Sequence, residues 1–470
     1  MKFRVFPWIG LTLLLIGIVT LAFNVQSVKA ESKTWTVDDD GPADFSSIQA
    51  AINAASSGDT VFVRSGIYSE TLTIAKAISL IGENRDFTII DGSEGPGSQA
   101  LYINSNGVLV TGFTVQNGTH SNIMIVSDDN KIIGNRIANN TWMGGVYVQY
   151  GAQNIIQDNI FCNNRQGIYL YWYTSINNLV INNSIMNSQS YGIEIWYSKN
   201  NTISGNVLKS NYEGIRLSWE AVNNSIFENT LWDNYVGVSL SCDIGDESSD
   251  NSFYHNNFLD NTNQVTSFNS ISTWDDGYPS GGNYWSDYTG VDADGDGIGD
   301  TPYIVDGDSQ DNYPLKGMFS NYSVSYQEDA YDVTIICNST VSGFHFNYAE
   351  GTIDFDVAGV DSTAGFCRIM IPRALIESPY TILVDGQEVA YTELSLSNSA
   401  LAFLYFTYSH STHHVKIMAT PPPPAPPPVG GTTIAIESKH LSLWIASTIL
   451  MMSLVVASNI YLERKKSEKE

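Results

Sequence analysis

A short pattern recurs through the middle of the chain and limits what this sequence can fold into. In each copy a glycine precedes an alternating run, as in Gly145-Val-Tyr-Val, Gly167-Ile-Tyr-Leu, Gly192-Ile-Glu-Ile, Gly214-Ile-Arg-Leu and Gly237-Val-Ser-Leu. These glycines are 22, 25, 22 and 23 residues apart. A period in the low twenties indicates a stack of repeated units, each of which buries its apolar face against its neighbours.

Two asparagines five residues apart mark every unit. The pairs are Asn130/Asn135, Asn154/Asn159, Asn178/Asn183, Asn201/Asn206, Asn224/Asn229 and Asn251/Asn256. Asparagine tolerates the left-handed backbone conformation at a corner, and stacked side-chain amides hydrogen-bond from rung to rung. Each unit holds short alternating apolar runs without a helix signal, and the leucine consensus of leucine-rich repeats is absent. We therefore expect an all-β fold built on a right-handed parallel β-helix.

The strand after each glycine should have one inward and one outward face. Residues one and three positions after the glycine are aliphatic, so we expect them to stack inside the β-helix. Among the outward positions is an aromatic strip, which consists of Tyr147, Tyr169, Tyr171, Trp172, Trp196, Tyr197 and Trp219. Exposed contiguous rings bind sugar rings, although such a strip can also stiffen a β-helix beneath a covering segment. Glu194 and Arg216 lie beside these rings and are the candidate catalytic residues.

Both ends of the repeat region carry recognisable segments. Residues 44–55 form an amphipathic pattern that predicts a helix capping the β-helix ahead of a first strand at 60–63. The runs TWTVDDDGPADFSSIQAAINAASSGDTVFVRSGIYSE and GGNYWSDYTGVDADGDGIGDTPY, with the paired asparagines, resemble the NosD-type β-helix family. This family is a branch of the pectin-lyase-like carbohydrate-binding and sugar-hydrolase repeats, common in archaeal-type surface proteins. The resemblance covers roughly residues 33–316, and it implies a β-helix outside the membrane but no particular reaction.

The composition divides the remaining chain into further segments. We expect a signal peptide at 1–30 (or an uncleaved anchor helix), the β-helix with a C-terminal acidic cap region at 31–319, and an Ig-like β-sandwich at 320–419. A proline-rich linker at 420–439, a transmembrane helix at 440–462 and a cytoplasmic tail at 463–470 should follow. This order predicts a single-pass cell-surface protein. Its N-x-[ST] sequons, at Asn117, Asn139, Asn182, Asn200, Asn223, Asn321 and Asn338, fit an exported glycoprotein.

The four cysteines are too few for a disulfide scaffold. Cys337 and Cys367 both fall on expected sandwich strands, and the sequence is compatible with either a disulfide between them or two free thiols. Cys162 and Cys242 fall three rungs apart, which is too far for a bond without distortion.

Charge excludes one class of partner and points to a metal. The formal net charge is −27, so the protein should repel nucleic acid. Asp292, Asp294, Asp296 and Asp300 alternate around Gly297 like the first half of a calcium loop. Tyr303 stands where an EF-hand has its glutamate, and Asp306, Asp308 or Asp311 would have to complete the ligand set. We expect calcium there, and a solvated acidic turn is the alternative.

Copper is the metal tied to the NosD name, as part of the copper supply of nitrous oxide reductase. The seven histidines are scattered, and the one cluster, His410, His413 and His414, falls in the sandwich. Runs of methionine or cysteine that would hold Cu(I) are absent. The sequence therefore argues against copper.

Three functions remain open, and the sequence favours the first. The first is non-catalytic binding of surface glycans or envelope polymers through the aromatic strip. The second is a polysaccharide lyase or glycoside hydrolase. A hydrolase needs two carboxylates, and Glu194 has no second acid in its column, with Glu220 the nearest candidate at a corner. The third is a NosD-like copper-processing accessory or a purely structural envelope spacer.

Overall fold

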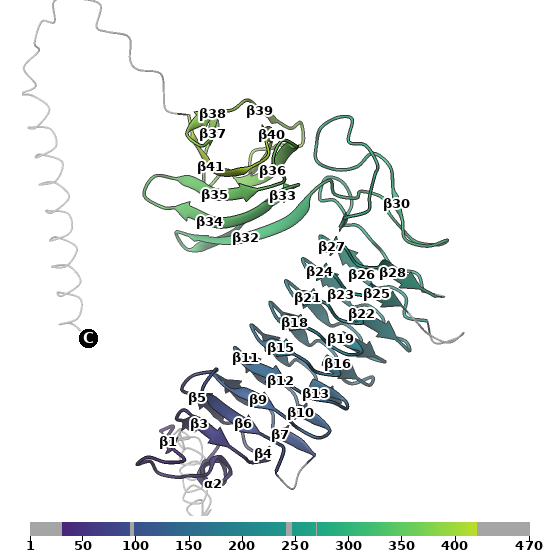
Figure 1. Ribbon diagram of the computed structural model, residues 1–470. Coiled ribbons are helices and arrows are strands. Elements are labelled where there is room, and N and C mark those ends of the chain that lie inside the picture. The colour runs from purple at the N-terminus through teal and green to yellow at the C-terminus, as the bar shows by residue number, and fades with distance from the viewer. Residues whose placement is uncertain (1–30, 95–97, 241–246, 269, 421–470) are drawn as a thin grey trace, which may run out of the picture. The chain divides into compact units, whose positions relative to one another are not determined.

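The computed structural model describes residues 31–94, 98–240, 247–268 and 270–420. The predicted signal peptide, transmembrane helix and cytoplasmic tail, and all but the first residue of the predicted linker, lie outside the described residues. Within these residues, no helix has the length and apolar character needed to span a membrane. The described chain is almost entirely β-strand, with one short helix, so the all-β prediction is confirmed (Figure 1).

Three parallel sheets run side by side and form a right-handed β-helix, which confirms the predicted fold (Figure 1). The first sheet consists of β1 (Thr34–Val37), β2 (Thr60–Val63), β5 (Ser79–Gly82), β8 (Leu109–Thr111), β11 (Lys131–Ile133), β14 (Ile155–Gln157), β17 (Leu179–Ile181), β20 (Thr202–Ser204), β23 (Ser225–Phe227) and β26 (Ser252–Tyr254). The second consists of β4 (Leu72–Ile74), β7 (Gln99–Ile103), β10 (Ser121–Ile125), β13 (Gly144–Gln149), β16 (Gln166–Tyr171), β19 (Tyr191–Trp196), β22 (Glu213–Ser218), β25 (Val236–Leu240) and β28 (Asn263–Ser267). The third consists of β3 (Gly66–Tyr68), β6 (Thr88–Asp91), β9 (Thr114–Gln116), β12 (Arg136–Ala138), β15 (Ile160–Cys162), β18 (Ser184–Met186), β21 (Val207–Lys209), β24 (Thr230–Trp232), β27 (Asn257–Leu259) and β29 (Tyr284–Trp285).

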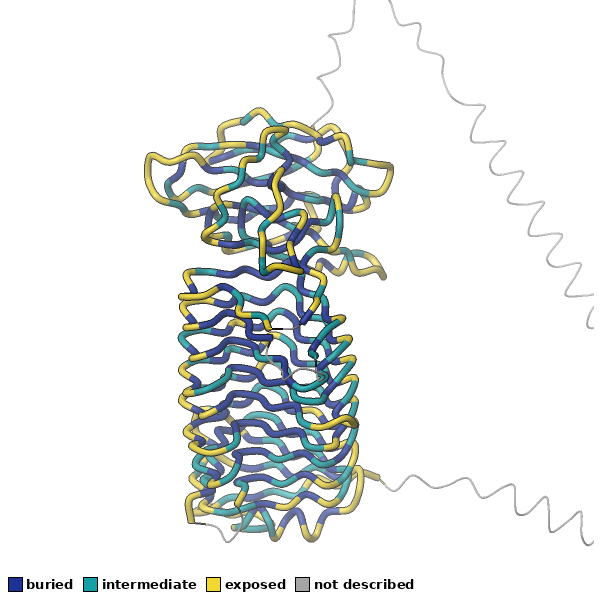
Figure 2. Tube along the Cα trace, turned by 90° about the vertical axis from the view of Figure 1, so that its right-hand side faces the viewer, coloured by how far each residue is buried: buried dark blue, intermediate teal, exposed yellow. Residues whose placement is uncertain are grey.

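The interior of the β-helix is a set of aliphatic columns. In the second sheet, Ile168 pairs in register with Ile193, which pairs with Ile215, and all three are fully buried. The residues two positions further on repeat this arrangement, as predicted from the alternation. Figure 2 shows the result as buried positions that recur at the same place in successive rungs.

Buried asparagines connect the rungs through side-chain hydrogen bonds. The Asn135 amide donates to Asn159 Oδ1 at 3.2 Å, and Asn159 donates to Asn183 at 3.0 Å. This ladder continues through Asn206, Asn229, Asn256 and Asn283, each accepting from the rung before. A second ladder runs from Asn130 to Asn251 in the same manner. The predicted stacking of amides is therefore confirmed.

The predicted backbone conformation of these asparagines is wrong. From Asn130 to Asn261, the left-handed residue is the one immediately before the ladder asparagine, such as Asp158 (φ 55°) and Gly205 (φ 66°). The turn made by that residue directs the next side chain inward, where its amide can reach the neighbouring rungs. A third ladder, absent from the prediction, lies five residues further on and includes Asn211, Asn234 and Asn261.

The repeat glycines are needed for close approach of neighbouring rungs. A Cβ on Gly192 would lie 2.6 Å from the carbonyl oxygen of Gly214 and 2.8 Å from Leu208 Cδ2, both inside the β-helix. A side chain at these glycine corners would point into the β-helix, where the neighbouring rung leaves no room for it.

We expect Gly192→Ala to lower the free energy of unfolding by about 1–3 kcal/mol, because the added methyl group overpacks this corner. Urea unfolding followed by circular dichroism measures the change. Gly307→Ala is the control, since an added Cβ there meets nothing within 4 Å. Equal stability of the two variants would contradict the close-approach explanation.

Different structural elements cover the two ends of the β-helix. At the N-terminal end, helix α2 (Ile48–Ala54) begins after Ser47 and buries Ile48, Ala51 and Ile52. This helix confirms the predicted cap, although it is shorter than expected and β1 precedes it. The carboxylate of Glu70 accepts hydrogen bonds from the backbone N–H of Ile48 at 2.9 Å and of Gln49 at 3.1 Å.

At the C-terminal end, a carboxylate terminates one asparagine ladder. Asp311 Oδ2 accepts from the backbone N–H of Asn283 at 2.7 Å and from Trp285 Nε1 at 2.9 Å. The Trp285 ring stacks on Phe258 at 4.2 Å and on Tyr303 at 4.2 Å, and it closes the interior. The short hairpin of β30 (Tyr303–Ile304) and β31 (Gln310–Asp311) supplies this carboxylate. Burial raises the pKa of Asp311 to about 7. Asp311 is thus part of this end cap, whereas it was one of three aspartates considered for completing the calcium ligand set, with Asp306 and Asp308.

Two five-stranded antiparallel sheets follow and form the predicted β-sandwich. One consists of β32 (Met318–Tyr326), β33 (Asp329–Cys337), β36 (Ala364–Pro372), β40 (Leu401–Ser409) and β39 (Tyr391–Glu393). The other consists of β34 (Thr340–Asn347), β35 (Thr352–Ala358), β41 (Thr412–Ala419), β37 (Tyr380–Val384) and β38 (Gln387–Glu388).

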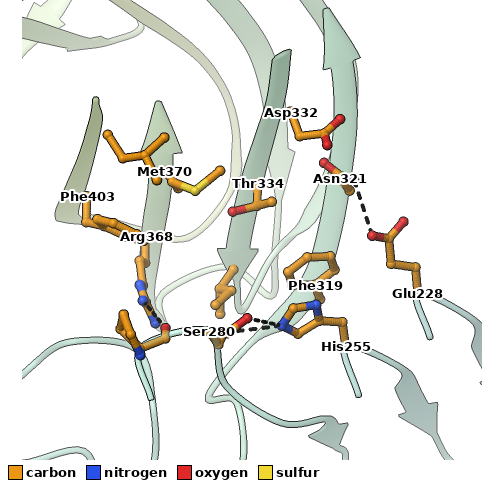
Figure 3. Close-up of a pocket in the computed structure, with 13 residues that line it drawn as sticks. Glu228, His255, Ser280, Phe319, Asn321, Asp332, Thr334, Arg368, Met370 and Phe403 are labelled. Carbon is orange, nitrogen blue, oxygen red and sulfur yellow. Dashed lines mark hydrogen bonds between the residues drawn. The ribbon is translucent and has the colours of Figure 1, made fainter. Parts of the chain in front are cut away.

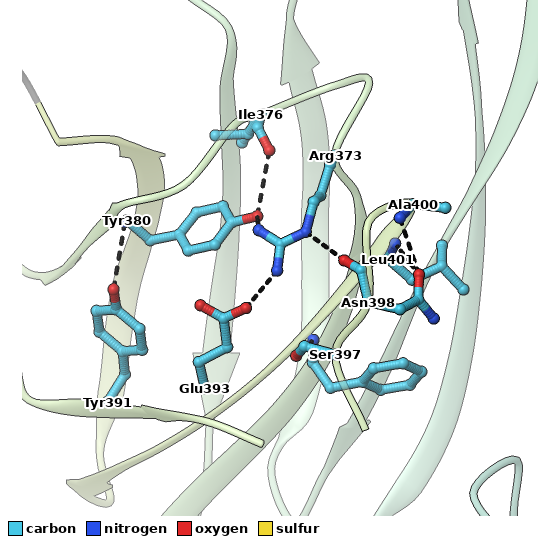
Figure 4. A network of polar contacts seen from close by, with 10 residues as sticks. Arg373, Ile376, Tyr380, Tyr391, Glu393, Ser397, Asn398, Ala400 and Leu401 are labelled. Atoms are coloured by element: carbon cyan, nitrogen blue, oxygen red, sulfur yellow. Dashed lines mark hydrogen bonds and ion pairs between the residues drawn. The ribbon is translucent and has the colours of Figure 1, made fainter. Parts of the chain in front are cut away.

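Polar contacts fix the edge of the sandwich. The Arg373 guanidinium donates to Asn398 O at 2.7 Å and to the Tyr380 hydroxyl at 3.2 Å, and it pairs with Glu393 (Figure 4). This network holds the segment after β36 against the edge strand β39.

The two sandwich cysteines face each other without a bond. Cys337 and Cys367 occupy opposed positions of β33 and β36, and their sulfur atoms are 2.7 Å apart. Both are thiols in this structure, and their opposed positions fit a disulfide equally well, so both alternatives stay open. In the β-helix, Cys162 is half-buried and unpaired, and Cys242 lies outside the described residues.

Candidate functional site

The aromatic strip lies on the outer face of the second sheet, where its rings touch from rung to rung. Tyr147 stacks on Tyr169 with centroids 5.1 Å apart, and Tyr169 stacks on Trp196 at 6.1 Å. Tyr171 contacts Trp172 at 5.3 Å. Further contacts connect Trp172, Tyr197 and Trp219 across the next rungs. The structure therefore brings all seven predicted rings together in one continuous group.

The rings differ in how far they are exposed. Trp172 is 36% exposed, and Tyr171, Trp196, Tyr197 and Trp219 are half-buried. Tyr147 and Tyr169, however, are 3% and 2% exposed, although they do not belong to the core inside the β-helix. The prediction that these two rings face solvent is wrong, because neighbouring rings of the strip pack over them.

Part of the strip is held in a backbone conformation that bulky residues rarely adopt. Tyr150, Trp172, Tyr197 and Trp219 occupy the same corner in four successive rungs, with φ of 66°, 86°, 54° and 56°. Asparagine and glycine are the residues that usually adopt this left-handed region, and strain of this kind concentrates at functional sites. A row of large aromatic residues at strained corners is therefore difficult to explain by folding alone.

Charged residues form a largely buried cluster next to the aromatic strip, on the same outer face of the second sheet. Gln166 Nε2 donates to Glu194 Oε2 at 2.7 Å, and Arg216 Nε lies 3.7 Å from Glu194 Oε1. Arg216 Nη1 is also 3.5 Å from the carboxylate of Glu213, and the guanidinium lies 4.8 Å from the Tyr191 ring centroid. The predicted pair of Glu194 and Arg216 is therefore in contact, and a second carboxylate meets the same guanidinium.

Burial changes how these carboxyl groups titrate. Desolvation raises the pKa of Glu194 to about 7, despite the opposing charge of Arg216 and with help from the charge of Glu213. Desolvation also raises the pKa of Glu213. A carboxyl group with a pKa near neutrality can hold or release a proton under physiological conditions, as acid–base chemistry requires.

The sequence reasoning missed Gln166, Tyr191 and Glu213 as members of this cluster. All three stand immediately before a repeat glycine. Strict alternation would send that position inward, but the chain bends at the glycine, which itself points inward. The residues before and two after the glycine therefore share the outer face. The repeat glycine was the available signal, because a glycine repeated at the same place in each unit can mark a bend that breaks the alternation.

The predicted calcium loop is partly assembled. The carboxylates of Asp292, Asp294 and Asp296 lie within 4.8 Å of one another, whereas Asp300 accepts from the Ala293 backbone at 2.7 Å. Asp292 also accepts from the backbone of Gly297 at 2.9 Å, which tightens the turn. A second aspartate group, residues 38–40, converges in the same way. Carboxylate oxygens are the ligands that calcium prefers, so calcium at the first group remains our prediction.

We expect calcium to raise the melting temperature of the protein, because a divalent cation relieves repulsion among the three carboxylates. Asp294→Asn combined with Asp296→Asn should abolish this response, while Asp361→Asn combined with Glu377→Gln, at two exposed acids of the sandwich, should keep it. Differential scanning fluorimetry with calcium and with chelator measures both. A wild-type melting curve that ignores both additions would identify the loop as an acidic turn.

One family model matches this chain, and several solved structures are distantly similar to it. The family model described as "Periplasmic copper-binding protein (NosD)" matches residues 52–290, just over half of the chain. No curated protein matches the chain. An alginate lyase from Paenibacillus sp. str. FPU-7 is similar over 54% of this chain and 98% of its own, with 14% identity and a TM-score of 0.41. Pectate lyase Pel9A is similar over 56% and 84%, with 16% identity and a TM-score of 0.43. A tailspike protein, gp49 from Acinetobacter baumannii bacteriophage Fri1, is similar over 83% and 85%, with 11% identity and a TM-score of 0.29. These distant likenesses say nothing of the activity of this chain.

Proposed function

We propose that this chain, which belongs to the NosD family, binds surface glycans or envelope polymers along the aromatic strip without cleaving them. The row of aromatic residues at left-handed corners carries the proposal, because these positions cost stability and present rings outward. Sugar rings stack on exposed aromatic faces. The spacing of rungs, about 4.8 Å, lets one extended polymer contact several rings in turn.

We expect Trp172→Ala to weaken binding of a retained polysaccharide several-fold, since one stacking contact contributes about 0.5–1.5 kcal/mol. Trp232→Ala is a matched control: Trp232 is 40% exposed against 36% for Trp172, but it lies on the third sheet. Affinity electrophoresis against a panel of polysaccharides measures retention, and thermal melting checks that neither change unfolds the protein. Equal loss of retention in both variants, or a large fall in melting temperature for Trp172→Ala, would contradict the proposal.

A second candidate function, glycan cleavage, is favoured by the buried cluster. Glu194 and Glu213 meet one guanidinium, and a pair of carboxyl groups is what a glycoside hydrolase requires. A polysaccharide lyase would instead use a base beside the charge of Arg216. In either reaction Glu194 would exchange a proton with the sugar.

If Glu194 is the acid of a hydrolase, release of reducing sugar should fall as the pH rises through about 7, because the raised pKa keeps Glu194 protonated only below that value. Glu194→Gln should abolish release and keep retention, whereas Glu220→Gln, at a nearby corner, should keep both. Release that survives Glu194→Gln, or no release at any pH, would remove this candidate.

Copper, which the family description names, does not fit the described residues. His413 uses both ring nitrogens, with Nδ1 at 2.7 Å from Asp385 and Nε2 at 2.7 Å from the Ser409 carbonyl. His414 lies 2.9 Å from Asp356. In the described part of the chain, both groups of three converging potential ligands consist of aspartates, which suit calcium and not copper. No step of the proposed function involves copper.

A further inference from the structure

A cavity of about 390 Å³ lies between the last rungs of the β-helix and one sheet of the sandwich (Figure 3). Loops of the β-helix with Glu228, His255 and Pro279 form one wall. The other wall is the face of β32, β33, β36 and β40, and its apolar part consists of Phe319, Ile336, Met370, Leu401 and Phe403. Cavities of this size with mostly apolar walls and a few polar groups are typical of small-molecule sites.

Contacts between the two walls hold the cavity open. Asn257 forms two hydrogen bonds with the Phe319 backbone, at 2.9 Å and 2.8 Å. Arg368 Nη2 donates to Pro279 O at 2.7 Å. The His255 ring stacks on Phe319 with centroids 4.0 Å apart. The site is therefore formed before any ligand arrives.

Two polar groups on the walls have unmet hydrogen-bonding capacity. Arg368 is 3% exposed, and its Nη1 has no hydrogen-bond partner among the described residues. The side-chain oxygen of Asn321 likewise has none there, although its amide nitrogen donates to Glu228 at 3.2 Å. A buried polar group without a hydrogen-bond partner destabilises the protein, and a ligand that supplies the partner recovers that free energy.

Opposite charges stand at the two sides of the cavity. Figure 3 shows Arg368 on one side and Glu228 with Asp332 on the other. Arg368 is nearly fully buried, and burial together with the charge of Asp332 raises the pKa of Glu228. An anion beside Arg368 and a cation beside the two acids would offset both desolvation costs.

We propose that this cavity binds a small dipolar molecule with an apolar body. The body lies against Phe319 and Phe403, a carboxylate faces Arg368, and an amine faces Glu228 and Asp332. The site is separate from the aromatic strip and does not depend on glycan binding.

The test is isothermal titration of the full chain with three matched probes. The first, 4-(aminomethyl)benzoate, carries a carboxylate and an amine at opposite ends of one ring. The others, 4-methylbenzoate and 4-methylbenzylamine, each lack one charged end. The dipolar probe should bind at least tenfold more tightly than either of the other two.

Variants then assign the binding to this cavity. Leu401→Trp should fill the apolar part and abolish binding of all three probes. Asp332→Asn, at an exposed position, should weaken the two amine probes several-fold and leave 4-methylbenzoate unchanged, while the exposed Asp361→Asn should change nothing. Equal affinity for the three probes, absence of binding, or binding that survives Leu401→Trp would overturn the proposal.

Discussion

The hydrogen bond from one buried asparagine to the next is the interaction on which the rest of this structure depends. The chain of a parallel β-helix winds around the interior and bends at every corner. Backbone polar groups on the inner side of those corners are removed from water. Asn183, for example, donates to Asn206 on the next rung and to the Ile156 carbonyl on the previous one. These bonds satisfy buried groups and fix each rung against its neighbours. Aliphatic packing and the glycine corner follow from the register that they impose.

Because the interior determines the fold, the outer face of the second sheet has considerable freedom. Glu194 and Ser239 occupy equivalent places two residues after a repeat glycine, in rungs whose interiors are nearly the same. Folding therefore does not require rings or charges at these places. The aromatic residues at left-handed corners even oppose local backbone preference, which is why we assign them to binding.

The sequence allowed much of the fold to be predicted and less of the site. Period and alternation are properties of every rung, so the inward columns around Ile193 and the amide ladders were predictable. The burial of Tyr169 was not, because it depends on how neighbouring rings lean over one another. Glu213 was missed because the bend at the glycine breaks the alternation. The thiols of Cys337 and Cys367 were placed opposite each other by register, which sequence spacing alone does not give.

The asparagine ladders also have a direction. Between two asparagines of a ladder, the amide on the N-terminal rung donates and the amide oxygen on the C-terminal rung accepts, so the small dipoles of these bonds point the same way. In the ladder that ends at Asn283, the carboxylate of Asp311 accepts from the backbone N–H of Asn283, where earlier rungs have the amide oxygen of the next asparagine. The Asn283 amide itself donates to the carbonyls of Phe253 and Trp274. A ladder of this kind can lengthen or shorten only by whole rungs. The N–H group at its C-terminal end always needs a hydrogen-bond acceptor. The molecule is therefore polar along its axis, and its two ends are not chemically interchangeable.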